Sequence, residues 1–179
     1  VVFYSGSGED GGAGGINGQN GIGGAGGNGG NVTINIVNDL NSRGAVNASG
    51  GTGANGGDAF SGNGGHGGNA GEVILNVGHD LNALQIDFVG GTGGERGYSN
   101  NAGVGGEGGK GGDVHITVAN NINTSGQINI SGGQGYGDFR DEPGDPANIQ
   151  GTSRGGDGGS VWVSAKNLTT TDILGLTGN

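Results

Sequence analysis

The feature that most constrains this chain is a run of glycine at every third residue, which changes within two residues into an alternating apolar pattern. The run is Gly12, Gly15, Gly18, Gly21, Gly24, Gly27 and Gly30, and Val32-Thr33-Ile34-Asn35-Ile36 follows it directly. A three-residue period suits an extended threefold helix, whereas a two-residue period indicates a β-strand with one buried face. The sequence therefore predicts an extended arm that leads into a strand.

The same junction recurs along the chain. Val32, Val73 and Val114 begin equivalent strands that are 41 residues apart, and Val161 begins a fourth. A second short strand of the form apolar-x-apolar-x-Gly precedes each glycine segment. The strands are predicted near residues 2–4, 32–37, 45–48, 73–77, 85–88, 114–118, 127–130, 161–165 and 173–176. Self-similarity at a period of this length is typical of stacked repeat proteins.

These patterns predict an all-β fold: a repeat β-solenoid with repeats of about 41 residues, two short strands in each, and stacked glycine-rich arms of the polyglycine II type. Residues 1–179 form a single domain of about four rungs. One apolar column is Val32, Val73, Val114 and Val161, and another is Val2, Val46, Ile86, Ile128 and Leu174. A lone apolar residue at each corner is expected to close the core, namely Leu40, Leu81, Ile122 and Leu168.

The arms need partners outside themselves. A threefold extended helix makes no internal hydrogen bonds, and ordering glycine costs conformational entropy. Because glycine recurs in phase, one edge of each arm can approach a neighbouring arm backbone to backbone. The alternative is a set of flexible glycine-rich linkers, which the strict phase disfavours.

Composition excludes several classes of protein. Glycine makes up 52 of 179 residues but proline only 2, which argues against a collagen triple helix. With 16 acidic against 6 basic residues, the chain lacks the basic clusters that nucleic acid requires. It has no cysteine for disulfides or thiolate chemistry, and no apolar run of the roughly 20 residues needed for membrane insertion. Because it begins at Val1, we expect it to be a piece of a longer protein.

The corner motifs Asp39-Leu40-Asn41 and Asp80-Leu81-Asn82, with echoes at residues 121–123 and 167–169, resemble the haemagglutinin-like β-solenoid repeats of secreted bacterial adhesins. The glycine arms resemble those of springtail antifreeze proteins and of the receptor-binding tips of phage tail fibres, which are polyglycine II bundles. The resemblance implies a secreted, extracellular or cell-surface protein.

Few residues suggest site chemistry, and we predict no catalytic residue and no cofactor. Residues 137–154 depart from the repeat and form a variant acidic loop. Its acidic residues are a calcium candidate or else a solvated surface loop, and they are Asp138, Asp141, Glu142 and Asp145. Trp162, on the outward face of its strand, is a candidate for stacking on a sugar or another partner.

The leading functional hypothesis is a non-enzymatic structural or adhesive protein: a stalk, a matrix element or a self-stacking filament. Its partners would be other copies stacked end to end, or neighbouring repeats of a longer parent chain. Two alternatives remain open. One is ice binding by a flat polyglycine II face, and the other is glycan or receptor binding through loop 137–154 with Trp162.

Overall fold

The computed structural model describes residues 2–9, 11, 22–57, 63–94, 106–135, 156–170 and 172–177, and all regular structure within these ranges is β-strand. Sheet A contains β1 (Val2–Tyr4), β4 (Ala45–Ser49), β7 (Gln85–Val89), β10 (Gln127–Ser131) and β13 (Asp172–Thr177). Sheet B contains β2 (Val32–Ile36), β5 (Val73–Val77), β8 (Val114–Val118) and β11 (Val161–Ser164). Sheet C contains β3 (Leu40–Asn41), β6 (Leu81–Ala83), β9 (Asn121–Thr124) and β12 (Asn167–Thr169).

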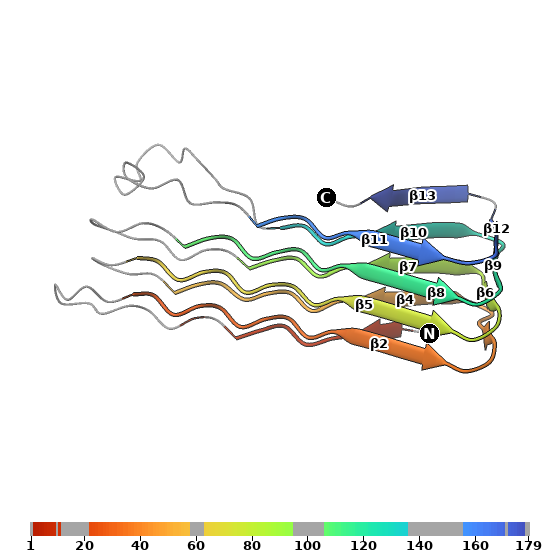
Figure 1. Ribbon diagram of the computed structural model, residues 1–179, viewed down its shortest axis with the longest axis horizontal. Coiled ribbons are helices and arrows are strands. Elements are labelled where there is room, and N and C mark those ends of the chain that lie inside the picture. The colour runs from red at the N-terminus through yellow and green to blue at the C-terminus, as the bar shows by residue number, and fades with distance from the viewer. Residues whose placement is uncertain are drawn as a thin grey trace.

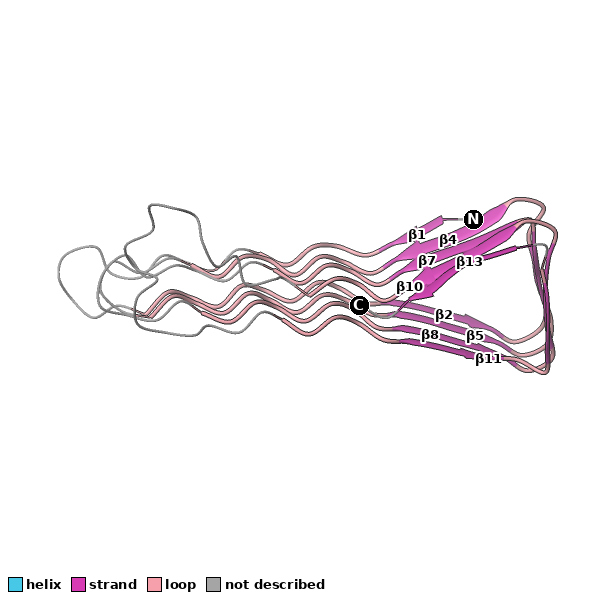
Figure 2. Cartoon of the chain, turned by 90° about the horizontal axis from the view of Figure 1, so that it is seen from above, coloured by secondary structure: helices cyan, strands magenta, loops and turns pink. Residues whose placement is uncertain are grey.

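The chain winds as a solenoid, and every pair of neighbouring strands is parallel. Each rung passes through sheet B, then sheet C, then sheet A; β2–β4 form the first rung and β11–β13 the last. Figure 2 shows the three sheets as the sides of a triangle, with sheets A and B converging towards the glycine arms. Figure 1 shows the rungs stacked in chain order. The all-β repeat solenoid predicted from the sequence is confirmed.

The core lies inside this triangle. In sheet B, Val32, Val73, Val114 and Val161 align in the predicted column. The middle rungs are the best packed: Leu75, Leu81 and Phe88 are each 0% exposed. Alternation explains the pattern, because every second side chain of a strand points to the same face. Burying one such side chain contributes about 1.5–3 kcal/mol.

Sheet C was not predicted. The corner sequences suggested turns, but they are extended and pair with their neighbours in register. Their outward asparagines form a ladder: Asn82 Nδ2 donates to Asn41 Oδ1 at 2.7 Å, and Asn123 Nδ2 donates to Asn82 Oδ1 at 2.8 Å. Stacked amides of this kind stabilise parallel strands in register, so residues that favour turns in isolation form strands here.

The inward residues beside this ladder differ from rung to rung. Leu81 and Ile122 are 0% and 2% exposed, whereas Leu40 is half-buried and Leu168 is 43% exposed. Leu40 and Leu168 belong to the first and last rungs, where sheet C has a neighbouring strand on one side only.

The predicted register of two strands in sheet A is wrong. Val2 was expected to lie beside Val46, but it pairs with Asn47, and Phe3 pairs with the buried Ala48, so Phe3 is the inward residue of β1. Val2 and Tyr4 are therefore outward, at 51% and 78% exposure. The arm sets this register: Gly30 N donates to Gly6 O, and a Cβ on Gly51 would overlap the same oxygen. A one-residue slip of the strand reverses the face of every side chain.

At the other end of sheet A, β13 contains a bulge. Ile173 pairs with Ile128 and Leu176 with Ile130, so the register shifts between them. Leu174 therefore leaves the column predicted for it. A bulge places two residues opposite one and suits a position with glycine, which here is Gly175.

The arms form two layers. The outgoing arms leave sheet A (residues 6–9, 50–57, 90–94 and 132–135), and the returning arms enter sheet B (residues 22–31, 63–72, 106–113 and 156–160). Their triplets read Gly-Gly-Xaa with few exceptions. The first residue donates its N–H within its own layer, as in Gly26 N to His66 O at 2.9 Å. The second donates across to the other layer, as in Gly27 N to Glu9 O at 2.7 Å.

One ladder of cross-layer bonds joins all the rungs. In the following series, the N–H of each glycine donates to the carbonyl oxygen of the glycine named after it, at 2.8–3.2 Å: Gly159, Gly133, Gly112, Gly91, Gly71, Gly51, Gly30 and Gly6. Of the glycines in the opening run, Gly24, Gly27 and Gly30 occupy this second position, while Gly12, Gly15, Gly18 and Gly21 lie outside the described residues. The arms thus bond to neighbouring arms, as the threefold spacing predicts.

Both glycines of a Gly-Gly-Xaa triplet lie close to neighbouring backbone. Gly71 is the second residue of its triplet, and a Cβ on it would overlap Gly30 O in the neighbouring arm of the same layer. Gly50 is the first residue of its triplet, and a Cβ on it would overlap Gly71 O in the opposite layer. The threefold spacing predicted close approach along one edge of each arm. The structure shows two such edges, because each arm has neighbours within its own layer and in the opposite layer.

We predict that Gly71→Ala lowers the free energy of unfolding by about 2–3 kcal/mol, because the methyl group must displace backbone. Gly44→Ala is the matched control, since a Cβ at Gly44 meets open space and should change the free energy by less than about 0.5 kcal/mol. Urea unfolding followed by circular dichroism measures both variants. Equal effects of the two substitutions would contradict this packing.

Candidate functional site

The predicted calcium ligands fall in a segment that the structure does not describe. Asp138, Asp141, Glu142 and Asp145 lie outside the described residues, as does the whole of loop 137–154. Within the described ranges, no group of three or more histidine, cysteine or acidic side chains could hold a metal ion. The same part of the chain contains no helix of the length and apolarity that a membrane span requires.

Polar side chains on the outer face of the returning arms bond one rung to the next. Several third-position N–H groups of these arms donate to a side chain of the neighbouring rung. Asn69 N donates to Asn28 Oδ1 at 2.9 Å, and Lys110 N donates to Asn69 Oδ1 at 3.0 Å. Each such bond contributes about 0.5–1.5 kcal/mol. These asparagines therefore complete the backbone hydrogen bonding of the arms.

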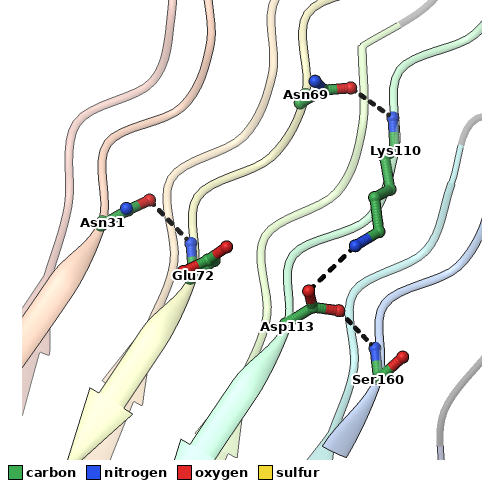
Figure 3. A network of polar contacts seen from close by, with 6 residues as sticks. All are labelled: Asn31, Asn69, Glu72, Lys110, Asp113 and Ser160. Carbon is green, nitrogen blue, oxygen red and sulfur yellow. Dashed lines mark hydrogen bonds and ion pairs between the residues drawn. The ribbon is translucent and has the colours of Figure 1, made fainter.

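The next row, where the arms enter sheet B, carries an ion pair (Figure 3). Glu72 N donates to Asn31 Oδ1 at 2.9 Å, and Ser160 N donates to Asp113 Oδ1 at 2.7 Å. The second carboxylate oxygen of Asp113 accepts from Lys110 Nζ at 2.9 Å. The Asp113 side chain is only 13% exposed, whereas that of Lys110 is 47% exposed.

The pKa values of this pair follow from those contacts. Burial alone would raise the pKa of Asp113, but the hydrogen bonds from Lys110 and from the Ser160 N–H outweigh it, so the pKa lies below its ordinary value. The hydrogen bond to Asp113 raises the pKa of Lys110, against the opposing effect of burial. Both groups are thus held in their charged forms.

The bonds that side chains make between rungs all point the same way along the stack. In each of these, the donor belongs to the later rung and the acceptor to the earlier one. The direction is the same on the outer faces of the sheets, where the amide nitrogens of Asn76, Asn129 and Asn167 donate to Asn35, Asp87 and Asn121. The first and last rungs therefore present different groups to whatever lies beyond them.

The last rung holds the predicted partner-binding residue. Trp162 on β11 is 53% exposed and stacks on His115 of β8, with ring centroids 4.5 Å apart and an interplanar angle of 11°. The pair continues an outward row formed by Thr33, Ile74, His115 and Trp162. One face of the indole thus packs on the imidazole, while β11 has no further strand of sheet B beyond it.

The apolar interior is also exposed at the last rung. Val163 and Leu168 occupy inward positions but are 37% and 43% exposed, whereas their counterparts one rung earlier, Ile116 and Ile122, are each 2% exposed. Beside them lies a cavity of about 220 Å³ whose lining includes Ile116, Ile122, Ile130, Val163 and Leu168. The last rung thus has an exposed aromatic ring, an exposed part of the apolar core and the edge strand of sheet B.

Comparison with known proteins adds little to this picture. No protein-family model matches the chain, and no curated protein matches its sequence. One solved structure is similar: the springtail antifreeze protein from Granisotoma rainieri, a nine polyproline type II helical bundle. The identity is 22%, the match covers 91% of this chain and 94% of that one, and the TM-score is 0.21. A TM-score this low carries no argument about the fold or the function.

Sequence reasoning identified the outward position of Trp162 but missed its partner. The signal was present, because His115 follows Val114 as Trp162 follows Val161, which places the two rings in one row. The exposure of Val163 and Leu168 was also missed, because their counterparts in the middle rungs are buried.

The Lys110–Asp113 pair predicts a pH dependence. Because the pKa of Asp113 is lower in the folded chain, its contribution to stability is complete above the unfolded value of about 3.8 and is lost as the pH falls through the folded value. We expect Asp113→Asn to flatten this acid limb, and Lys110→Gln to reduce it by removing the cation. Urea unfolding at a series of pH values measures this. An acid limb unchanged in both variants would show that the pair does not contribute.

Proposed function

We propose that this chain is a non-enzymatic structural and adhesive element that works outside the cell or at its surface. It forms a segment of a glycine-rich β-solenoid that serves as a stalk, a matrix element or a self-stacking filament. The observation that carries the proposal is that outer side chains of the returning arms bond one rung to the next. Asn28, Asn31 and Asn69 bond the next rung, so this surface builds length and rigidity.

The same logic supports extension by further repeats. Each rung meets the next through three sheets and two arm layers, and these contacts recur from rung to rung. In repeat proteins of this kind, stability is close to a sum of the terms for each rung and for each interface between neighbours. Neighbouring repeats of a longer parent chain would use the same contacts.

Single-molecule pulling between residues near Val2 and Thr177 tests this role. Bonds between rungs are spaced 41 residues apart, so release of one rung should lengthen the chain by about 140 Å at roughly 3.4 Å per residue. We expect a series of such steps, with lower forces in Gly71→Ala than in Gly44→Ala. A single extension of the whole chain at one force would contradict a rung-by-rung structural element.

A second function is favoured by Trp162. Its indole is half exposed at a strand edge, and His115 fixes the orientation of the ring. A flat aromatic face held in place is suited to stacking against the apolar face of a sugar. Glycan or receptor binding at this residue, with loop 137–154 as a neighbour in sequence, would make the chain an adhesin.

Titration of Trp162→Ala with oligosaccharides selected on a glycan array tests this second function. Because stacking contributes about 0.5–1.5 kcal/mol, the affinity should fall up to about tenfold. Tyr4→Ala is the matched control, since Tyr4 is an outward aromatic residue that is 78% exposed on β1. Equal affinities of the two variants would remove Trp162 from the site.

The ice-binding alternative gains no support from this geometry. The outer residues of the returning arms differ from rung to rung, as in the row Asn28, Asn69 and Lys110. The side chains of Asn28 and Asn69 already bond the neighbouring rung, and that of Lys110 bonds Asp113. Thermal hysteresis of the purified chain would measure such an activity directly.

A further inference from the structure

The three sheets have unequal numbers of strands, and this decides how copies can join. Sheet A has five strands, whereas sheets B and C have four each. Suppose that β2 and β3 of a second copy stack on β11 and β12. In sheet A, the position beside β4 of the incoming copy is then held by β13 of the first copy, but β1 of the incoming copy needs that same position. Two copies therefore cannot continue one solenoid with both strands seated.

We propose that the last rung is a docking surface for the first rung of a second copy, and that β1 is a displaceable cap which must leave before docking. In the joined state, β13 of one copy pairs with β4 of the next and replaces its β1. This inference rests on the structural role proposed above and specifies how the element would assemble with itself.

The apolar surfaces match in register. Val163 lies in one column with Ile116, Leu75 and Ile34, and Leu168 lies in another with Ile122, Leu81 and Leu40. Docking would place Ile34 of the incoming copy on Val163 and Leu40 on Leu168. Contacts of this kind between middle rungs leave Leu75 and Ile122 no more than 2% exposed. The outer face of Trp162 would be covered by Thr33 of the incoming copy.

The polar groups allow only a head-to-tail arrangement. Asn167 directs its amide nitrogen back to Asn121 at 2.8 Å, so its carbonyl oxygen faces beyond the last rung. The residue in register on the first rung is Asp39, because this row runs Asp39, Asp80, Asn121 and Asn167. Within the chain, the N–H of Asn121 donates to Asp80 at 3.0 Å, and Asp39 N–H would donate to Asn167 in the same way.

β1 is held by few contacts. It has three residues, of which Val2 and Tyr4 are at least half exposed and only Phe3 packs against the core. Asn47, the register partner of Val2, has a buried Oδ1 without a hydrogen-bond partner among the described residues, so this polar atom does not help to hold β1. β13 is longer, with six residues, and can take the place of β1.

Light scattering after size-exclusion chromatography, over a wide range of protein concentrations, tests the cap. Salt belongs in the buffer because the net charge of −10 on each copy opposes association. Phe3→Asp should release β1 and raise the average mass at least twofold. Tyr4→Asp is the matched control, because it adds the same charge to the outward face of the same strand and should leave the mass unchanged. Adding Leu168→Lys to Phe3→Asp should restore the monomer.

A disulfide provides an independent test, since the natural chain has no cysteine. Tyr4 and Ser49 are register partners on the outward face, so Tyr4→Cys with Ser49→Cys should lock β1 onto β4 when oxidised. At protein concentrations high enough for the natural chain to associate, we expect the locked form to stay monomeric and the reduced form to associate as the natural chain does. This pair decides the question if circular dichroism shows that Phe3→Asp has lost its fold.

Three results would overturn the inference: a folded Phe3→Asp chain that stays monomeric, association that survives Leu168→Lys, or equal masses of the oxidised and reduced double-cysteine chain. The proposed structural role is read separately, from the stepwise extension of single molecules of the natural chain. If those steps are present while the chain never associates, only the capping inference fails.

Discussion

The structure depends on backbone hydrogen bonds between neighbouring glycine arms. An extended threefold arm has no internal bonds, so its N–H groups must find acceptors elsewhere. The Gly-Gly-Xaa triplet provides two, one within a layer and one across the layers, because neither glycine has a Cβ to hold the neighbouring backbone away. In the returning arms, several third-position N–H groups are accepted by a side chain of the neighbouring rung, as at Asn28 and Asn69. Backbone and side-chain bonds thus both join rungs along the arms.

The hydrogen bonds between arms explain how a chain with few apolar residues folds. Hydrophobic residues are 29% of the sequence, and they are concentrated in the triangular core between the sheets. The core fixes the rungs at one end of each arm pair, and the arm ladders extend the same stacking outward (Figures 1 and 2). Because both parts repeat along one axis, the contacts of one rung recur in the next.

The two ends of the stack are where this pattern is incomplete. Val163 and Leu168 are inward yet exposed, and the stack of His115 and Trp162 ends at an open ring face. Sheet A carries one strand more than the other two sheets, so the last rung cannot accept a copy unless β1 or β13 moves. Among the described residues, an exposed aromatic ring and exposed inward side chains thus occur in the same rung.

The sequence alone determined the repeat length, the position of the strands in sheets A and B, and the arms that bond to one another, because each has a local period that can be read directly. Only the tertiary structure decided the register of β1, the third sheet at the corners and the exposure of the last rung. Phe3 rather than Val2 faces inward because Gly6 and Gly51, 45 residues apart, set the register through the arms. Asn41, Asn82 and Asn123 form strands because their amides stack. Such contacts join distant residues, and no local pattern in the sequence encodes them.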